Sequence, residues 1–438
     1  MGTRSDGLSR KAARPARGRR CQLALLPSWH RHTPGNGELT MNRTIMLSSN
    51  TAWSIVNFRS GLIRHLQSDG YSVVAVAPHD AHAPRLIDLG CRFIDLPMDN
   101  HGTHPGRDML LLARYLRLLK ALRPSVYLGY TVKPNVYGSL AAHALRIPVV
   151  NNIAGLGSAF VENNLLTRIV QALYKCSLRG SERVFFQNGE DRELFIRSGL
   201  VGADSTDRLP GSGVDLSRYP ARAPSVLHGR PFRFLLVARV LRSKGIVEYV
   251  EAARAVRRHV SNARFQLLGF VEKRDRNAIP VEDIRAWERE GVLDYLGGTD
   301  DVVPFLAEAD CVVLPSYYRE GVPRALLEAA AMARPLIASD AVGCRDAVDD
   351  GINGFLCKPK NANDLAQKML AMIRLDPRVR IHMGMAGRRK VEAEFDERLV
   401  LNKYSDVIRA IEQNGRIRQG RQRTGSVSGG REYARTED

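Results

Sequence analysis

Strand-like and helix-like segments alternate along most of the chain, and this alternation limits the fold more than any other feature. From Met41 the apolar run RTIMLSS leads into IVNFRSGLIRHLQSDG, whose apolar residues recur at helical spacing and which ends at Gly70. The same succession continues through YSVVAVAP, APRLIDLG and CRFIDLP. Such alternation is typical of a parallel sheet with helices on both faces, so the sequence predicts an α/β fold.

A second alternating series begins near Pro231, with RFLLVAR, GIVEYVEAARAVRRHV and RFQLLG. The stretch that joins the two series is rich in Gly, Pro and Ser, which is typical of a connection between domains. We therefore predict two doubly wound, Rossmann-like domains that face a central cleft. In such sheets, ligands bind beyond the carboxyl ends of the strands.

The sequence predicts six segments in order. They are a basic disordered extension (1–40), a first α/β domain (41–215), a linker (216–230), a second α/β domain (231–395), a last helix (396–413) and a basic disordered tail (414–438). The segment RKAARPARGRR is also compatible with a transit peptide or a phosphate-binding arm, but the sequence restarts at Met41 with a strand-like run. We interpret 1–40 as an over-long start that the fold does not need.

The net charge of +19 suggests nucleic acid, acidic lipid or phosphorylated ligands as partners. Residues 1–40 hold eight basic residues against two acidic ones, and the tail from Gly415 holds six against three. About half of the excess charge thus lies outside the predicted domains, and no nucleic-acid-binding motif is present. The charge distribution therefore argues against a nucleic-acid binder.

The sequence contains neither a membrane-spanning segment nor a cysteine-based site. No run reaches eighteen apolar residues. The six cysteines are scattered without a C-x-x-C pair, which indicates neither a zinc site nor a disulfide framework and favours a cytoplasmic location. Two acidic pairs, Asp300/Asp301 and Asp349/Asp350, are better explained as helix-start and turn residues than as metal ligands. No metal is predicted.

The stretch REGVPRALLEAAAM places Glu320 and Glu328 eight positions apart, directly after the strand-like CVVLPS. Pro323 suits the first position of a helix, where its missing N–H has no consequence. The free amides at such a helix start form an anion site that fits a diphosphate, between two carboxylates that accept hydroxyl hydrogen bonds. The residues of this predicted anion site are Gly321, Val322, Arg324, Ala325 and Leu326.

A second strand exit, VARVLRSKG, carries Arg239 and Lys244 on the loop before the next helix. Two cations at such a position can hold a diphosphate and neutralise a departing phosphate. Arg242, between them, is interpreted as a solvated residue.

These motifs resemble those of family 4 retaining glycosyltransferases of the GT-B fold. The second series carries the likeness in VARVLRSKG, YLGGTDDV, DGINGFL and the Glu320 stretch. The first series carries it in NTAWSIVNFRSGLIRHL, YTVKPNVYGSLAAHALRIPVVNNIAGLG, VFFQNGEDRELF and PGSGVD, which resemble the branch that assembles polysaccharides and lipid-linked oligosaccharides. The likeness spans roughly Met41 to Gln413.

The resemblance implies transfer of a hexosyl or N-acetylhexosaminyl group from a nucleotide-sugar, most often a UDP-sugar, with retained configuration and without a metal or other cofactor. It implies that Arg239 and Lys244 contact the diphosphate, that Glu320 contacts the donor sugar, and that Glu328 contacts the ribose. The implied acceptor is a glycan or a polyprenyl-diphosphate-linked saccharide, which binds the first domain. The second domain binds the donor. The resemblance also implies that the last helix crosses back to the first domain.

The sequence also departs from the family. Many members have a histidine near the reacting sugar, where this chain has Ala154, Gly155 and Gly157. No catalytic histidine is therefore assigned, and both glycines remain cleft candidates. The first loop lacks paired glycines, which leaves three further cleft candidates, Asn50, Trp53 and Ser54. Lys133, at a strand exit, is compatible with an acceptor phosphate or with an ordinary surface position.

The segment 109–124, MLLLARYLRLLKALRP, fits a helix that packs on the core with a basic outer face. It also fits an interfacial helix attracted to anionic lipid at the inner face of the plasma membrane. Two alternatives to a glycosyltransferase remain, a sugar-nucleotide epimerase of the GT-B type and a basic protein that binds nucleic acid or membrane.

Overall fold

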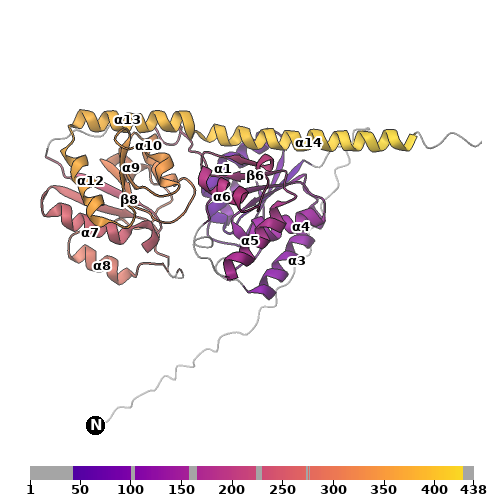
Figure 1. The fold of residues 1–438 in the computed structure, drawn as a ribbon, viewed down its shortest axis with the longest axis horizontal. Helices are drawn as coiled ribbons and strands as arrows, with labels where there is room; N and C mark the ends of the chain where they lie inside the picture. The colour runs from indigo at the N-terminus through magenta and orange to yellow at the C-terminus, as the bar shows by residue number, and fades with distance from the viewer. Residues whose placement is uncertain are drawn as a thin grey trace, which may run out of the picture. The chain divides into compact units, whose positions relative to one another are not determined.

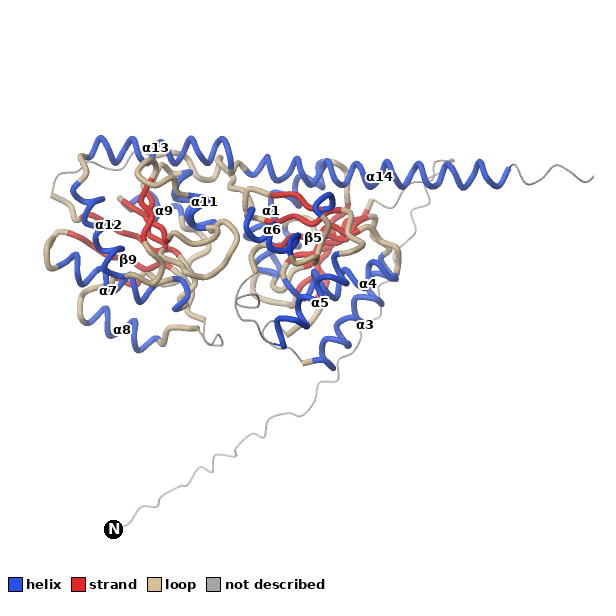
Figure 2. Tube along the Cα trace, in the orientation of Figure 1, coloured by secondary structure: helices blue, strands red, loops and turns tan. Residues whose placement is uncertain are grey.

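The computed structural model describes residues 43–99, 104–156, 165–222, 229–272, 275 and 277–427, with side chains of the last helix described to 415. Two parallel sheets dominate these residues, each enclosed by helices (Figures 1 and 2). This confirms the predicted α/β class with two Rossmann-like domains. The extension 1–40 lies outside the described residues.

The first sheet has the strand order β3-β2-β1-β4-β5-β6-β7, and all of its pairs are parallel. Its strands are β1 (Thr44–Ser48), β2 (Ser72–Ala77), β3 (Arg92–Asp95), β4 (Val126–Tyr130), β5 (Val149–Ile153), β6 (Arg183–Phe186) and β7 (Thr206–Arg208). Its helices are α1 (Ala52–Ser68), α2 (Ala83–Asp88), α3 (Pro105–Leu122), α4 (Ser139–Ala144), α5 (Leu165–Leu178) and α6 (Gly189–Arg197), with a π-helical turn at Pro134–Gly138 and a 3-10 turn at Ala203–Ser205. The strand order reverses between β1 and β4, so their carboxyl ends open a crevice at the start of α1.

The second sheet has the order β10-β9-β8-β11-β12-β13, again with parallel pairs. Its strands are β8 (Phe232–Val237), β9 (Ala263–Leu268), β10 (Asp294–Tyr295), β11 (Cys311–Leu314), β12 (Leu336–Ser339) and β13 (Gly354–Cys357). Its helices are α7 (Ile246–Arg257), α8 (Val281–Arg289), α9 (Val303–Glu308), α10 (Arg324–Ala331), α11 (Cys344–Ala347), α12 (Ala362–Arg374) and α13 (Pro377–Glu394), with a 3-10 turn at Arg242–Lys244. Here the order reverses between β8 and β11, which are the strands that precede the two predicted donor loops.

Side chains that alternate along each strand fill two cores, one on each face of a sheet. In β8, Phe234 and Leu236 pack with α7, whereas Leu235 packs with α10. Figure 1 shows α7 and α8 on one side of β8 and α10 on the other. In β1, Ile45 and Leu47 pack with α1, and Met46 packs with α3. Burial on both faces explains why these strands are continuous apolar runs in the sequence.

The last helix, α14 (Glu397–Val427), returns from the second sheet to the first. Val400, Tyr404 and Ile408 are buried against the core of β1 and α1. The Tyr404 hydroxyl accepts a hydrogen bond from Asn152 Nδ2 at 3.1 Å, which fixes α14 to β5.

The helix is longer than predicted. It continues past Gln413 to Val427, so the first part of the tail expected to be disordered is helical. Gly415 does not end the helix, because a glycine lowers helix propensity by only about 1 kcal/mol and ends a helix reliably only in the left-handed conformation. The rest of the tail, 428–438, lies outside the described residues.

Among the described residues, no helix combines the length and the apolar character needed to cross a membrane.

Candidate active site

A cavity of about 560 Å³ opens at the carboxyl ends of the central strands, and both sheets line it. The start of α1 contributes Asn50, Trp53 and Ser54, the three cleft candidates of the first loop. From the second sheet come Arg239, Lys244, Glu320, Arg324, Ala325 and Glu328. The volume of the cavity lies in the range of ordinary ligand sites. The fold therefore brings residues from both halves of the sequence to one cavity.

Lys244 and Glu320 form an ion pair in the cavity wall. Lys244 Nζ donates to Glu320 Oε2 at 2.6 Å, and Ser316 Oγ donates to Glu320 Oε1 at 2.9 Å. The side chains are only 12% and 19% exposed. The sequence placed Lys244 at a diphosphate and Glu320 at a sugar, without predicting this contact. An ammonium group has three donors, so Lys244 can hold Glu320 and still reach a phosphate.

Gly245 fixes the loop that carries Lys244. It adopts φ +75°, and a β-carbon there would overlap the carbonyl of Pro315 at the exit of β11. Only glycine meets both requirements without strain. Arg239, earlier in the same connection, is exposed and lines the cavity. Arg242 pairs with Asp283 at the surface, 3.5 Å away, and does not line the cavity.

Glu328 is held by two donors on one oxygen. Arg324 Nε and the Tyr219 hydroxyl each donate to Glu328 Oε1 at 2.8 Å. Burial and the nearby Glu328 carboxylate raise the pKa of Tyr219, so its hydroxyl stays protonated and acts as a donor. Arg324 Nη1 also donates to the carbonyl of Asn57 in α1, at 2.7 Å.

The predicted anion site at the start of α10 is only partly available. The Gly321 amide donates to the carbonyl of Ala154 at 2.8 Å, and the Leu326 amide donates to the carbonyl of Pro323 at 3.1 Å. Val322 and Leu326 are buried in the core. The prediction treated every amide near the helix start as free, but tertiary packing and a tight first turn take two of them. Arg324 and Ala325 remain at the cavity, and Pro323 caps the helix instead of occupying its first position.

The loop after β5 reaches the backbone of the Glu320 loop. Gly155 has φ +132°, and a β-carbon there would lie 2.8 Å from Glu320 Cα and from the Gly321 nitrogen. The glycine that stands near the family's histidine position therefore permits close packing of the two loops. Gly157, the other glycine of this prediction, lies outside the described residues.

Both halves of the chain match known family descriptions. Residues 55–212 match the family "Glycosyl transferase 4-like domain", and 231–374 match "Glycosyl transferases group 1". Together the matches span more than half of the chain, one on each sheet. The chain belongs to the family 4 glycosyltransferases.

The glycosyltransferase is 27% identical over 382 residues to the N,N'-diacetylbacillosaminyl-diphospho-undecaprenol alpha-1,3-N-acetylgalactosaminyltransferase of Campylobacter jejuni, a match covering 84% of this chain and 98% of that protein. It is 25% identical over 317 residues to the UDP-Gal:alpha-D-GlcNAc-diphosphoundecaprenol alpha-1,3-galactosyltransferase of Escherichia coli, covering 69% and 79%. The crystal structure of HepE from Anabaena in complex with UDP and glucose superposes with a TM-score of 0.70 at 18% identity, covering 84% of this chain and 99% of that one. The fold of the glycosyltransferase is GT-B.

Lys133 lies away from the cavity of the glycosyltransferase. Its Nζ donates to Asp108 Oδ1 at 2.6 Å, and Tyr137 donates to the other oxygen of Asp108 at 3.0 Å. Lys133 is 14% exposed. That Lys133 meets an acceptor phosphate stays a prediction; the structure shows that its ammonium group pairs with Asp108 of α3.

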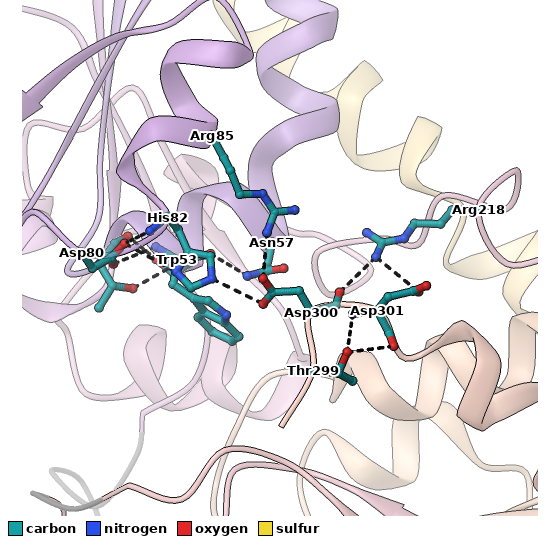
Figure 3. Close-up of polar contacts among 11 residues, drawn as sticks. Trp53, Asn57, Asp80, His82, Arg85, Arg218, Thr299, Asp300 and Asp301 are labelled. Atoms are coloured by element: carbon teal, nitrogen blue, oxygen red, sulfur yellow. Dashed lines mark hydrogen bonds and ion pairs between the residues drawn. The ribbon is translucent and has the colours of Figure 1, made fainter. Parts of the chain in front are cut away.

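Polar contacts join α2 to the loop before α9, whose Thr299 and Asp300 line the cavity (Figure 3). Arg85 Nη1 donates to Asp300 Oδ2 at 3.0 Å, and His82 Nε2 lies 3.4 Å from Asp300 Oδ1. In Figure 3, His82 lies between Asp80 and Asp300. Arg85 and Asp300 are 46% and 41% exposed, so this pair contributes little stability.

The acidic pairs have ordinary roles in the described structure. Asp301 accepts a hydrogen bond from the Val303 amide at the start of α9, and Asp350 accepts one from the Leu356 amide. Asp349 pairs with Lys390 at 3.0 Å. Within the described residues, no three His, Cys, Asp or Glu side chains gather in a way that could hold a metal ion.

Sequence reasoning missed Tyr219 and the side chain of Arg324. For Arg324 a signal was present, because residues four apart on a helix lie on one face and Arg324 is four positions before Glu328. For Tyr219 there was none, since it lies in the predicted linker, 109 positions from its partner.

Proposed function

We propose that this glycosyltransferase transfers a hexosyl or N-acetylhexosaminyl group from a UDP-sugar to a saccharide carried on a polyprenyl diphosphate, with retention of configuration. The proposed setting is the assembly of cell-surface polysaccharide. The two relatives named for undecaprenol-diphosphate-linked acceptors, and the neighbour bound to UDP and glucose, support this choice of substrates.

The observation that carries the proposal is the two-sided cavity with its paired charges. The carboxylates Glu320 and Glu328 both line it, and each is already bound to a cation, Lys244 or Arg324. A diphosphate held by Arg239 and Lys244 lies next to one carboxylate for the sugar, Glu320, and one for the ribose, Glu328. The acceptor enters from α1, whose first turn supplies Asn50, Trp53 and Ser54.

In this arrangement Arg239 and Lys244 neutralise the diphosphate as its bond to the sugar breaks. The acceptor hydroxyl attacks the same face of the sugar, and its proton passes to the departing diphosphate. The cations act on charge that develops in the transition state, where preorganised groups lower a barrier most.

Two measurements test the proposal. Thermal-shift screening against UDP-, GDP- and ADP-sugars identifies the donor, because a ligand that binds only the folded state raises the melting temperature. Turnover is then measured with a polyprenyl-diphosphate-linked monosaccharide, and NMR gives the anomeric configuration of the product. We expect a UDP-sugar, transfer and retention. Donor turnover without any acceptor would instead indicate an epimerase, and an inverted product would exclude the proposed mechanism.

Activity is expected to survive treatment with EDTA. Arg239, Lys244 and the amino-terminal end of α10 already supply positive charge to the diphosphate, so a metal is not needed for that task. The assay compares turnover before and after dialysis against EDTA. Loss of activity that Mg²⁺ or Mn²⁺ restores would contradict the expectation.

We propose further that the enzyme acts at the cytoplasmic face of the membrane and contacts anionic lipid through α3. The inner side of α3 packs on the core through Leu111, Tyr115 and Leu119, as the first of its two interpretations requires. Met109 and Leu110, near its start, are 63% and 49% exposed. Exposed apolar residues on a basic helix favour an anionic interface.

Vesicle co-sedimentation tests this contact. We expect binding to vesicles with phosphatidylglycerol, weaker binding to phosphatidylcholine alone, and a clear loss in Leu110→Asp. The matched control is Ile352→Asp, because Ile352 is equally apolar and 62% exposed but lies in the second sheet's domain. Equal binding by Leu110→Asp and wild type would exclude α3 as the contact.

A further inference from the structure

Arg324 occupies an unusual position for a cation. It is the first residue of α10, where the helix dipole disfavours positive charge. Yet it is only 14% exposed and lines the cavity. A long charged side chain held in this way indicates specific partners.

The partners of Arg324 come from three segments. Its Nε donates to Glu328 in the same helix, and its Nη1 donates to the Asn57 carbonyl of α1. Its guanidinium carbon lies 5.7 Å from the centre of the Phe58 ring. Its charge also acts on Glu397 at the start of α14, where it lowers a pKa that burial raises. The guanidinium therefore connects the donor helix to α1 and faces the beginning of the crossover helix.

The contact with Glu328 selects which oxygen is available to a ligand. Arg324 Nε and the Tyr219 hydroxyl both bond Oε1, each at 2.8 Å. An ionised carboxylate has about four acceptor positions. With two donors on Oε1, the carboxylate plane is fixed and Oε2 remains for a ligand hydroxyl.

We propose that Arg324 is a positioning residue, which holds Glu328 so that Oε2 accepts a ribose hydroxyl of the donor and ties this geometry to α1 through Asn57. This inference rests on the proposed function for its ligand, a nucleoside diphosphate. Lysine does not replace arginine here, because only the planar guanidinium can donate to Glu328 and to Asn57 in fixed directions. A direct contact between Arg324 and the diphosphate is the alternative that the experiment must exclude.

Calorimetric titration with two ligands separates these roles. UDP has the ribose hydroxyls and 2′,3′-dideoxyuridine diphosphate lacks them, while their diphosphates are identical. We expect Arg324→Met to weaken UDP binding about tenfold, the scale of a lost hydrogen bond to a charged group. The same variant should bind the dideoxy ligand as wild type does. Arg324→Met combined with Glu328→Gln should bind UDP no more weakly than Glu328→Gln alone.

Kinetics and a conservative variant add independent readouts. Arg324→Met should raise the donor KM and leave kcat within about twofold, since ribose binding is shared by ground and transition states. Arg324→Lys should keep the fold and the charge but not restore UDP affinity. It therefore tests the proposal even if the methionine variant folds poorly, which circular dichroism and melting would reveal.

The matched control is Arg345→Met. Arg345 also joins the two sheets, through Glu190 at 3.3 Å, but does not line the cavity. The Arg345→Met variant should bind UDP and the dideoxy ligand as wild type does. Equal losses of UDP and dideoxy ligand in Arg324→Met, or full rescue by lysine, would overturn the role of Arg324 and leave the proposed function intact. Wild type that fails to bind UDP would overturn both.

Discussion

Glu320→Gln is expected to lower kcat about 10²-fold, the scale of removing one preorganised electrostatic contact, with little change in the donor KM. In the proposed reaction, positive charge develops on the sugar as its bond to the diphosphate breaks. A carboxylate beside the sugar acts mainly on that developing charge, so its loss appears in kcat. Glutamine keeps the shape of glutamate but removes its charge.

Steady-state kinetics with varied donor and saturating acceptor measure the effect. Glu308→Gln is the matched control, because Glu308 also pairs with an arginine, Arg233 at 2.5 Å, yet does not line the cavity. Glu328→Gln serves as a contrast and should chiefly raise the donor KM. A near-normal kcat in correctly folded Glu320→Gln protein would show that Glu320 does not lie at the reacting sugar.

Lys244→Ala is expected to lower kcat/KM by about 10²-fold or more, with both kcat and KM affected. Lys244 attracts the diphosphate of the bound donor and of the departing product, so it contributes to binding and to the chemical step. Its 2.6 Å contact with Glu320 adds a second consequence. Because the two residues form one unit, Lys244→Ala and Glu320→Gln together should cost less than the product of their separate losses.

The control for Lys244 lies two residues away. Arg242→Ala removes a cation from the same 3-10 turn, but Arg242 pairs with Asp283 at the surface and is absent from the cavity wall. Its kinetics should match wild type. Arg239→Ala, in contrast, should show a loss comparable to that of Lys244→Ala. Strictly multiplicative losses in the Lys244/Glu320 double variant would show that the ion pair does not act as a unit.

The sequence by itself determined the architecture and the approximate place of the site. Two series of alternating strands and helices predict two parallel sheets. Helices then cover both faces of each sheet, and the buried strands appear in the sequence as continuous apolar runs. Ligand loops in such sheets follow the strand ends, so the positions of Arg239, Lys244 and Glu320 could be predicted from their place after apolar runs. Asn50, Trp53 and Ser54 reached the cavity for the same reason.

Only the tertiary structure decided which donors and acceptors meet. Sequence spacing made the Gly321 amide look free, but it donates to the Ala154 carbonyl, and spacing gave no sign that Lys133 pairs with Asp108. It also gave no sign that Tyr219 reaches the same oxygen of Glu328 as Arg324 does. The physical reason is that periodicity records which face of an element is apolar, whereas hydrogen bonds depend on positions within a few tenths of an ångström between segments distant in sequence.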